Sequence, residues 1–378
     1  MSRRSFKMSE KIFLGIGCGP IQTGIFVAGA SKGNFDKIVI AEVNPAMVEA
    51  IRKAGSITVN TSNAKGIVTN TYDKVEIYNP SVAEDLEILK DYASKAIAIN
   101  TALPATKFYQ FCVPWLKEGF KRTPDAQRYV YTSENSTTAA DDFKNTMAED
   151  FPNTYYLDTV IGKMSKIFKT AENPDLPPLA PGLDAGHLVE EFCTIYTSNA
   201  PGIDNVGIVG LYPKKDLYPF EEAKLYGHNA SHFALGMMAK ARKCTYMSEV
   251  AAFPEAMQEV KDLLINECGA ALCKKFAGVD DYFKVENFNA WAEELIERMV
   301  SPNLADSVDR IIRDLDRKLS WNDRSIGAIR MCLSQGVYPE LLIKNAKNAA
   351  AMYAFAQLGE AYPEAERQNL LDALTYEK

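Results

Sequence analysis

The sequence lacks the features that mark several classes of protein. Only three of its 378 residues are histidines, and its seven cysteines include no C-x-x-C pair, so neither a zinc site nor a dithiol centre is indicated. No stretch reaches the roughly 18 consecutive apolar residues of a membrane span, and the first residues lack the apolar core of a secretory signal. We therefore expect a cytoplasmic protein with reduced thiols that needs no metal.

The charge balance lacks a basic excess. A net charge of −7 and a pI near 5.3 argue against a dedicated nucleic-acid binder, because phosphate contacts require clustered cations. The chain is long enough for two domains of roughly 150 to 200 residues. A small-molecule partner is the remaining expectation.

The N-terminal half alternates apolar strands with helical segments. Residues 11–17 read as a buried strand running into a glycine-rich turn and a helix, and residues 37–44 read as a second strand followed by a helix over 46–54. Further strands are predicted at 96–100, 129–132 and 155–157, and irregular connections at 173–186 and 200–210. The pattern predicts an α/β fold, with a doubly wound Rossmann-type domain over residues 8–210. A mainly helical domain is predicted over 211–378, ending in a surface helix at 364–378.

The turn after the first strand carries Gly15, Gly17, Gly19 and Gly24. Glycines there permit a tight turn and a close approach of the backbone to a pyrophosphate. The strict G-x-G-x-x-G pattern fails, so a simple turn remains an alternative. Glu42 ends the second strand, where a carboxylate can bind both ribose hydroxyls of NAD and repel the extra phosphate of NADP. We therefore predict NAD.

A second polar motif begins the helical half. Lys224, Asn229 and His232 follow the spacing K-x4-N-x2-H. At 100° per residue, Asn229 lies about 140° and His232 about 80° from Lys224 on an α-helix, so the three share one side. A lone helical lysine is usually a solvated charge, but this trio can converge on one small ligand.

The trio has the spacing of the polyol-specific long-chain dehydrogenases and reductases, and the chain resembles that family. The stretch from Glu297 to Arg324 is very similar to its mannitol-1-phosphate 5-dehydrogenase branch. The glycine turn, Glu42 and the segment at 132–135 extend the likeness over most of the chain. The resemblance implies a cytoplasmic, NAD-dependent, metal-independent dehydrogenase that interconverts mannitol 1-phosphate and fructose 6-phosphate, as a monomer or small homo-oligomer.

The resemblance also implies roles for individual residues. Lys224 would be the acid or base, Asn229 would donate to the developing oxyanion, and His232 would hydrogen-bond a substrate hydroxyl. Asp158, Arg310 and Lys318 would contact the substrate. Further cofactor contacts would come from Asn100, Thr101, Ala102, Glu134 and Asn135. The other cations that could meet a phosphate are Lys163, Arg313, Arg317 and Arg324.

Several alternatives remain at this stage. His228 and His232 could form half of a zinc site, whereas His187 reads as structural or exposed. Gly162 and Lys163 replace an Asp-Arg pair that is usual in the family, which leaves free mannitol or a hexuronate (the fructuronate and tagaturonate reductases) as other substrates. The irregular glycine turn leaves open a catalytically inactive nucleotide-binding relative.

Overall fold

The computed structural model describes residues 10–358, so the helix predicted at 364–378 lies outside the described residues. The chain divides into two compact units, the first ending at Leu217 and the second beginning at Tyr218. Strand β12 (Leu211–Lys214), which follows the domain boundary expected at residue 210, belongs to the first unit. Within residues 10–358, no helix is both long enough and apolar enough to cross a membrane.

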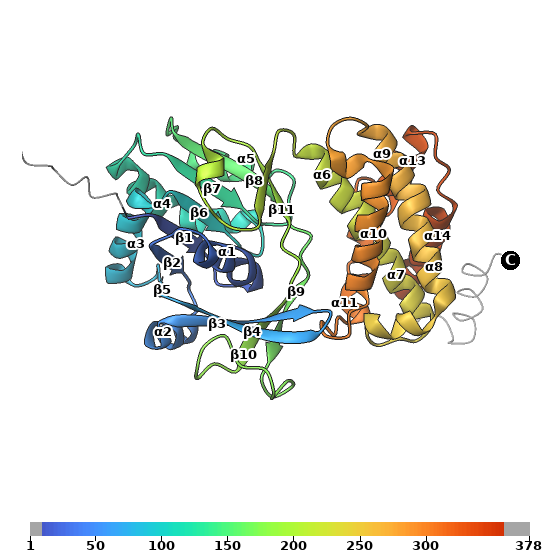
Figure 1. Ribbon diagram of the computed structural model, residues 1–378, viewed down its shortest axis with the longest axis horizontal. Coiled ribbons are helices and arrows are strands. Elements are labelled where there is room, and N and C mark those ends of the chain that lie inside the picture. The colour runs from blue at the N-terminus through green and yellow to red at the C-terminus, as the bar shows by residue number, and fades with distance from the viewer. Residues whose placement is uncertain (1–9, 359–378) are drawn as a thin grey trace, which may run out of the picture. The chain divides into compact units, whose positions relative to one another are not determined.

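The first unit is built on an eight-stranded sheet in the order β12-β11-β8-β7-β6-β1-β2-β5 (Figure 1). Neighbouring strands run parallel except for β11 against β8. From β5 to β8 the strands follow the order third, second, first, fourth, fifth, sixth along the chain, which is typical of dinucleotide-binding folds. The Rossmann-type α/β fold predicted from the sequence is confirmed. The strands span β1 (Ile12–Ile16), β2 (Lys37–Ala41), β5 (Val75–Tyr78), β6 (Ala98–Thr101), β7 (Arg128–Thr132), β8 (Thr154–Val160) and β11 (Ile195–Ser198).

Alternate residues of these strands enter two cores, one on each face of the sheet. Phe13 and Ile40 pack with the first helix, whereas Leu14 and Val39 pack on the opposite face with the helices after β5, β6 and β7. Burial on both faces explains why these strands read as continuous apolar runs. The helices of this unit are η1 (Gln22–Val27), α1 (Ala28–Lys32), α2 (Pro45–Ala54), α3 (Ala83–Lys95), η2 (Thr106–Phe108), α4 (Tyr109–Arg122), α5 (Ala139–Met147) and η3 (Ile203–Asn205).

A second, four-stranded sheet in the order β4-β3-β10-β9 was not predicted. It contains β3 (Ser56–Asn63), β4 (Gly66–Asp73), β9 (Ser165–Lys169) and β10 (Ala185–Glu190). Its β3–β4 hairpin is rich in Ser, Thr and Asn, and side chains pair across it: the Thr69 hydroxyl donates to Asn60 Oδ1 at 3.0 Å. Polar cross-strand pairs of this kind help to stabilise a hairpin. Its buried apolar residues are few, namely Ile57, Val59 and Tyr72, so its strand signal is weak.

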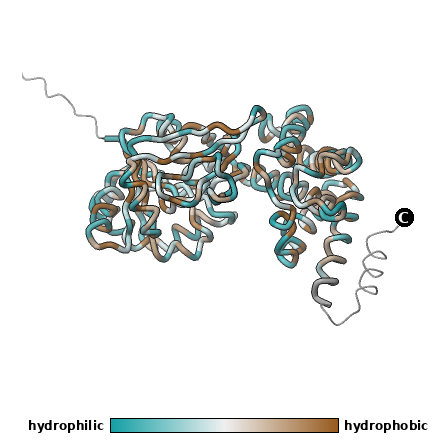
Figure 2. The backbone as a smooth tube through the Cα atoms, turned by 90° about the horizontal axis from the view of Figure 1, so that it is seen from below, coloured by the Kyte–Doolittle hydropathy of each residue, from teal (hydrophilic) through white to brown (hydrophobic). Residues whose placement is uncertain are grey.

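The second unit is helical, as predicted. It contains α6 (Tyr218–Glu222), η4 (Ala223–His228), α7 (Asn229–Ala241), η5 (Met247–Ala252), α8 (Pro254–Asp262), η6 (Leu263–Gly269), α9 (Ala270–Lys275), η7 (Asp281–Phe283), α10 (Val285–Met299), α11 (Val308–Ile312), α12 (Leu315–Lys318), α13 (Ile326–Ser334) and α14 (Glu340–Leu358). Helix α7 is buried along nearly its whole length from Ala230 to Ala239. Hydrophobic and hydrophilic residues alternate along the surrounding helices (Figure 2), which allows them to pack around α7 with one apolar face each.

Candidate active site

The glycine turn lies at the carboxyl end of β1, beside the end of β6. Gly17 has φ +83°, and its amide donates to the carbonyl of Ala41 at 2.9 Å. A Cβ at Gly17 would lie 2.8 Å from the carbonyl oxygen of Ala102, so only glycine fits this close approach. The structure therefore brings Gly17 and Ala102 together at the point where the strand order reverses, which is where such folds bind their ligands.

The other three glycines of the turn differ in their surroundings. A Cβ at Gly15 would lie 1.7 Å from Gln22 Nε2, and one at Gly24 would lie 2.6 Å from Val189, so these two glycines make room for protein side chains. A Cβ at Gly19 would meet nothing within 4 Å. Gly19 thus borders open space immediately before the helix, at whose N-terminus unpaired amides favour an anion.

Glu42 lies at the end of β2 and reaches back to the glycine turn. Its Oε2 accepts from the amide of Cys18 and its Oε1 from the amide of Asn44, both at 2.9 Å. The carboxylate is half-buried and is held by two backbone donors. Each carboxylate oxygen keeps a second lone pair that could accept from a ribose hydroxyl.

Glu134 and Thr101 belong to an internal hydrogen-bond network. Glu134 is 5% exposed and accepts from the Thr101 hydroxyl at 2.9 Å, from the Leu103 amide at 2.8 Å, and from the Tyr109 hydroxyl. These bonds tie the loop after β6 to α4 and to the end of β7. Glu134 therefore shapes the cofactor edge through the loop that it holds, whereas Asn135 beside it is exposed.

Two buried amides below the turn have unsatisfied atoms. Asn100 donates to the carbonyl of Tyr131 at 3.1 Å and to the Ser133 hydroxyl at 2.7 Å, but its Oδ1 has no partner, and neither amide atom of Gln22 has one, among the described residues. Buried amide groups without partners are rare. With the open space at Gly19 and the fixed Glu42 carboxylate, these atoms fit the binding of a polar dinucleotide at this edge.

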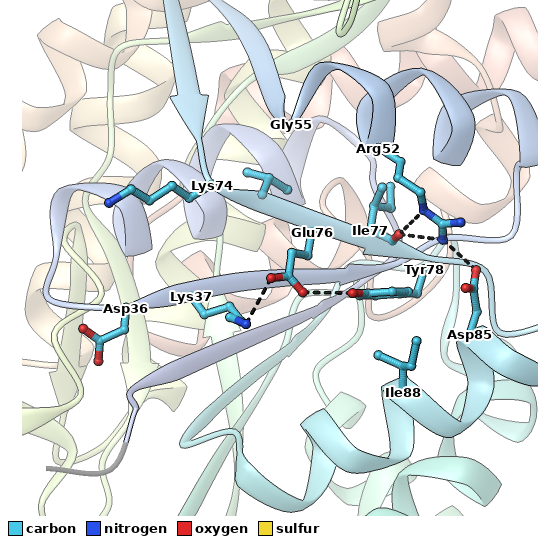
Figure 3. Close-up of a pocket in the computed structure, with 11 residues that line it drawn as sticks. Asp36, Lys37, Arg52, Gly55, Lys74, Glu76, Ile77, Tyr78, Asp85 and Ile88 are labelled. Atoms are coloured by element: carbon cyan, nitrogen blue, oxygen red, sulfur yellow. Dashed lines mark hydrogen bonds and ion pairs between the residues drawn. The ribbon is translucent and has the colours of Figure 1, made fainter. Parts of the chain in front are cut away.

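The pocket in Figure 3 is a different place. It has a volume of about 670 Å³ and begins at the amino ends of β2 and β5, where Lys37 and Lys74 lie. Four of its charged groups form two ion pairs: Arg52 binds Asp85 at 2.7 Å, and Lys37 binds Glu76 at 3.0 Å. Because parallel sheets bind ligands at the carboxyl ends of their strands, this pocket is not the cofactor site.

The predicted trio lies on one continuous helix, which runs through α6, η4 and α7. The expectation of a regular α-helix is wrong here, because η4 is a π-helix. The amide of Asn229 donates to the carbonyl of Lys224, five residues earlier, so Asn229 follows Lys224 by one full turn. The extra residue in that turn brings Lys224 and Asn229 closer to one face than 100° per residue allows.

Lys224 is a half-buried ammonium in a cationic neighbourhood. Its burial and the charge of Arg324 lower its pKa from 10.5 to about 8, while Glu221 opposes the shift. A lysine in this range is neutral in a useful fraction of molecules near pH 7. Asn229, one turn on, makes no side-chain hydrogen bond within the described residues, so its amide can donate to a ligand.

His232 lies on α7 and is 8% exposed. Burial lowers its pKa to about 4, against the charge of Asp306, so the imidazole is neutral at pH 7. Its Nε2 has no hydrogen-bond partner among the described residues. The ring of His228 lies 6.0 Å from that of His232, and its pKa is held well below the ordinary value by burial. Within residues 10–358 no three His, Cys, Asp or Glu side chains group as a metal site would require.

The three predicted substrate contacts belong to two different units of the chain. Arg310 forms a two-pronged ion pair with Asp306, and the Lys318 ammonium donates to the carbonyl of Ile311 at 2.6 Å in the buried interior. Asp158 lies in the first unit, where it accepts from the Ala140 amide at 2.9 Å in the first turn of α5. Arg310 and Lys318 thus lie in the helical unit with the trio, and Asp158 does not.

Two residues near these sites, Gln22 and Asp306, were not identified from the sequence. Gln22 belongs to the helix after the glycine turn, and no sequence pattern pointed to its amide. Asp306 lies just before α11 and is followed four residues later by Arg310, and this spacing of opposite charges was a visible signal of an ion pair. His187, by contrast, is structural: it is 2% exposed, and its Nδ1 lies 2.8 Å from the Thr23 hydroxyl.

A Rossmann-type unit with a glycine turn, followed by a helical unit with a low-pKa lysine beside an amide and a neutral imidazole, defines a nucleotide-dependent dehydrogenase. Residues 216–365 match the family model of the mannitol dehydrogenase C-terminal domain. The chain is 25% identical over 320 residues to a mannitol-1-phosphate 5-dehydrogenase of Arthrobacter sp. (strain FB24), covering 81% of this chain and 77% of that protein. It is 27% identical over 361 residues to one from Bacillus pumilus (strain SAFR-032), covering 92% and 89%.

A solved structure has the same fold. The mannitol 2-dehydrogenase of Pseudomonas fluorescens, in ternary complex with NAD and D-mannitol, superimposes with a TM-score of 0.67 at 13% identity, covering 97% of this chain and 86% of that one. Residues 216–365 thus carry the mannitol dehydrogenase C-terminal domain, and the chain is similar over most of its length to mannitol-1-phosphate 5-dehydrogenases. The predicted family is confirmed, and with it the class of NAD-dependent polyol dehydrogenases.

Proposed function

We propose that this protein interconverts mannitol 1-phosphate and fructose 6-phosphate by hydride transfer with NAD, with Lys224 as the general acid and base. The observation that carries the proposal is the low pKa of Lys224, about 8, on the same helix as Asn229 and His232. The substrate is favoured because relatives aligned over most of the chain are mannitol-1-phosphate 5-dehydrogenases. As a small-molecule enzyme it would act in the cytoplasm.

The reaction transfers one proton and one hydride in each direction. In oxidation, the neutral amine of Lys224 takes the proton of the reacting hydroxyl as its carbon loses a hydride. NAD, when bound, accepts that hydride. Asn229 donates from its side-chain amide to the developing oxyanion, and His232 orients the polyol through a second hydroxyl. In the reverse direction the Lys224 ammonium returns the proton to the carbonyl oxygen of the ketose.

The cofactor would be held by the first unit. The N-terminus of the helix that begins after Gly19 would face the pyrophosphate, and Glu42, held by the Cys18 amide, would accept from the ribose hydroxyls. Asn100, with its unpaired Oδ1, would take a polar group of the cofactor. Glu134 would act through the loop after β6 that it anchors, and Thr101 and Ala102 belong to that strand end and loop.

The phosphate of the substrate requires a cation that is not already committed. Arg310 is paired with Asp306, and Lys318 donates to a backbone carbonyl. Arg324 is 14% exposed and uses its Nε to bind its neighbour Asp323 at 2.8 Å, while its two Nη groups have no partner among the described residues. Its charge influences Lys224, His232 and Lys318. Arg324 is therefore the best-placed cation for the phosphate. Free mannitol or a hexuronate remains the alternative substrate.

The test is a comparison of substrates by the absorbance of NADH at neutral pH. Fructose 6-phosphate, fructose, fructuronate and tagaturonate are offered separately to the wild type, to Lys224→Ala and to Lys240→Ala. Lys240 is a matched control because it lies on α7 and pairs at 2.9 Å with the exposed Asp309. We expect fast turnover of fructose 6-phosphate, a loss of at least 100-fold in Lys224→Ala, and no change in Lys240→Ala.

The other outcomes separate the alternatives. Preferred turnover of one of the other ketoses would keep the family and Lys224 but replace the substrate. Binding of NADH without any turnover would favour the inactive nucleotide-binding relative. Equal activity of Lys224→Ala and wild type would refute the role of Lys224.

A further inference from the structure

The inference concerns the space between His232 and Asp306. The Nε2 of His232 and the Oδ2 of Asp306 are 3.9 Å apart, and their side chains are 11% and 9% exposed. This distance is too long for a direct hydrogen bond. Yet the Nε2 of His232 has no hydrogen-bond partner among the described residues, although a buried polar atom normally has one. A further hydrogen-bonding group is therefore needed to join these two side chains.

The Asp306 carboxylate is held firmly in this position. Arg310 forms a bidentate ion pair with it, in which Nε donates to Oδ1 at 2.6 Å and Nη2 donates to Oδ2. Its own carbonyl accepts from the amide of Met247 at 2.9 Å. Such a fork fixes the orientation of the carboxylate. Each carboxylate oxygen still has a lone pair free for another donor.

The packing of α11 against α7 explains how Asp306 reaches His232. Gly236 lies one turn after His232 on α7, and a Cβ there would come within 2.6 Å of Ile311. The missing side chain lets α11, with Asp306 just ahead of it, lie directly against α7. The placement of Asp306 is therefore built into the contact between the two helices.

One oxygen atom fits the geometry of the gap. An oxygen about 2.8 Å from both atoms would subtend an angle of about 90° between them, which hydrogen bonds to one hydroxyl allow. A hydroxyl both donates and accepts. It can donate to the Asp306 carboxylate and accept from the neutral imidazole of His232 in its Nε2–H form.

We propose that Asp306 is a substrate-binding residue, which together with His232 holds one hydroxyl group of the polyol. The proposal rests on the proposed function, since it concerns the same site. The proposal also predicts which end of the substrate lies near Asp306. The Asp306 carboxylate favours a neutral hydroxylated carbon and repels a phosphate, so an anionic end of the substrate has to lie away from Asp306.

The test compares Asp306→Asn with Asp309→Asn. Asp309 is the matched control, because it lies nearby on α11 but is 81% exposed, and within residues 10–358 its carboxylate pairs with Lys240 alone. The value of kcat/KM is measured with the full ketose substrate and with analogues that each lack one hydroxyl. We expect Asp306→Asn to lower kcat/KM for the full substrate roughly 10- to 100-fold, as loss of a charge-assisted hydrogen bond does. Asp309→Asn should stay within about twofold of the wild type.

The analogues provide the decisive readout. For the analogue that lacks the bound hydroxyl, wild type and Asp306→Asn should have nearly equal kcat/KM values, because the interaction is already absent. A uniform loss across all analogues would mean that Asp306 only supports Arg310, and the proposal would be overturned. If Asp306→Asn does not fold, Asp306→Glu keeps the charge but moves the oxygens, and its loss should again vanish for that one analogue.

Failure of the proposed function is recognised separately. If the wild type reduces none of the ketoses, calorimetric titration of mannitol into the NAD-loaded protein replaces turnover. Binding that is weakened by Asp306→Asn for mannitol, but not for one monodeoxy mannitol, would still support the role of Asp306. Binding that does not respond to Asp306→Asn would overturn it.

Discussion

Removing the charge of Arg324 should shift the pH dependence of catalysis to higher pH. Burial first, and Arg324 second, lower the pKa of Lys224 from 10.5 to about 8. At pH 7 a lysine of pKa 8 is neutral in roughly one molecule in ten, whereas at pKa 10.5 it would be neutral in about one in 3000. Since a tenfold change in proton affinity is about 1.4 kcal/mol, the site disfavours the ammonium by roughly 3 kcal/mol.

The sign follows from the form of lysine that each direction needs. Oxidation uses the neutral amine, so its kcat/KM should rise about tenfold per pH unit below pH 8 and level off above it. Reduction uses the ammonium and should fall above pH 8. In Arg324→Gln the pKa of Lys224 rises, so the midpoint of the oxidation profile moves upward and the rate at pH 7 falls.

The assay is the initial rate of NADH formation between pH 6 and pH 10, measured with an unphosphorylated polyol so that loss of a phosphate contact does not interfere. Arg324→Lys keeps the positive charge and is the control, with a profile expected to match the wild type. The reasoning would be refuted by an unchanged midpoint in Arg324→Gln, or by an oxidation rate that falls as the pH rises.

Three further outcomes concern the first unit. Gly17→Ala should destabilise the protein by about 1 to 3 kcal/mol and weaken NADH binding, because φ is +83° and the methyl group would meet the carbonyl of Ala102. Thermal unfolding measures the stability and NADH fluorescence the affinity, and an unchanged affinity would contradict the proposed place of the turn at the cofactor. Glu42→Gln should raise kcat/KM with NADP relative to NAD, and an unchanged ratio would contradict its role in selecting NAD. Glu134→Gln should cost roughly 2 to 4 kcal/mol in urea unfolding, since the carboxylate satisfies several buried donors including Tyr109; the exposed Glu118→Gln is its control.

The parts of the fold that the sequence predicted are those in which apolar periodicity determines the structure. The first two strands are buried on both faces, and the helix after the second strand begins with Asn44, which caps it, and ends at Gly55 with φ +66°. Each of these signals is local. The β3–β4 hairpin was missed because its pairing depends on cross-strand Thr and Asn contacts, which a single strand does not display.

The sequence predicts which residues form the candidate site, but not the local helix geometry or the side-chain partners around them. The spacing predicts Lys224, Asn229 and His232 as a catalytic trio, and their roles stay a prediction; periodicity at 100° per residue cannot reveal the π turn between them. Arg310 was expected to face the substrate, and its local ion pair with Asp306, four residues earlier, was overlooked. The approach of Asp306 to His232 depends instead on the packing of α11 against α7, which residue type alone does not reveal.

The π turn at η4 has a consequence for attempts to redesign this protein. A helix with one residue too many in a turn is less regular than its α-helical counterpart, and procedures that idealise a backbone would remove it. Deleting one residue there would give a smoother helix and would rotate everything after it by about 100° relative to Lys224. Regularising this helix would therefore turn Asn229 and His232 away from Lys224 unless α7, which is buried from Ala230 to Ala239, gave up its own packing.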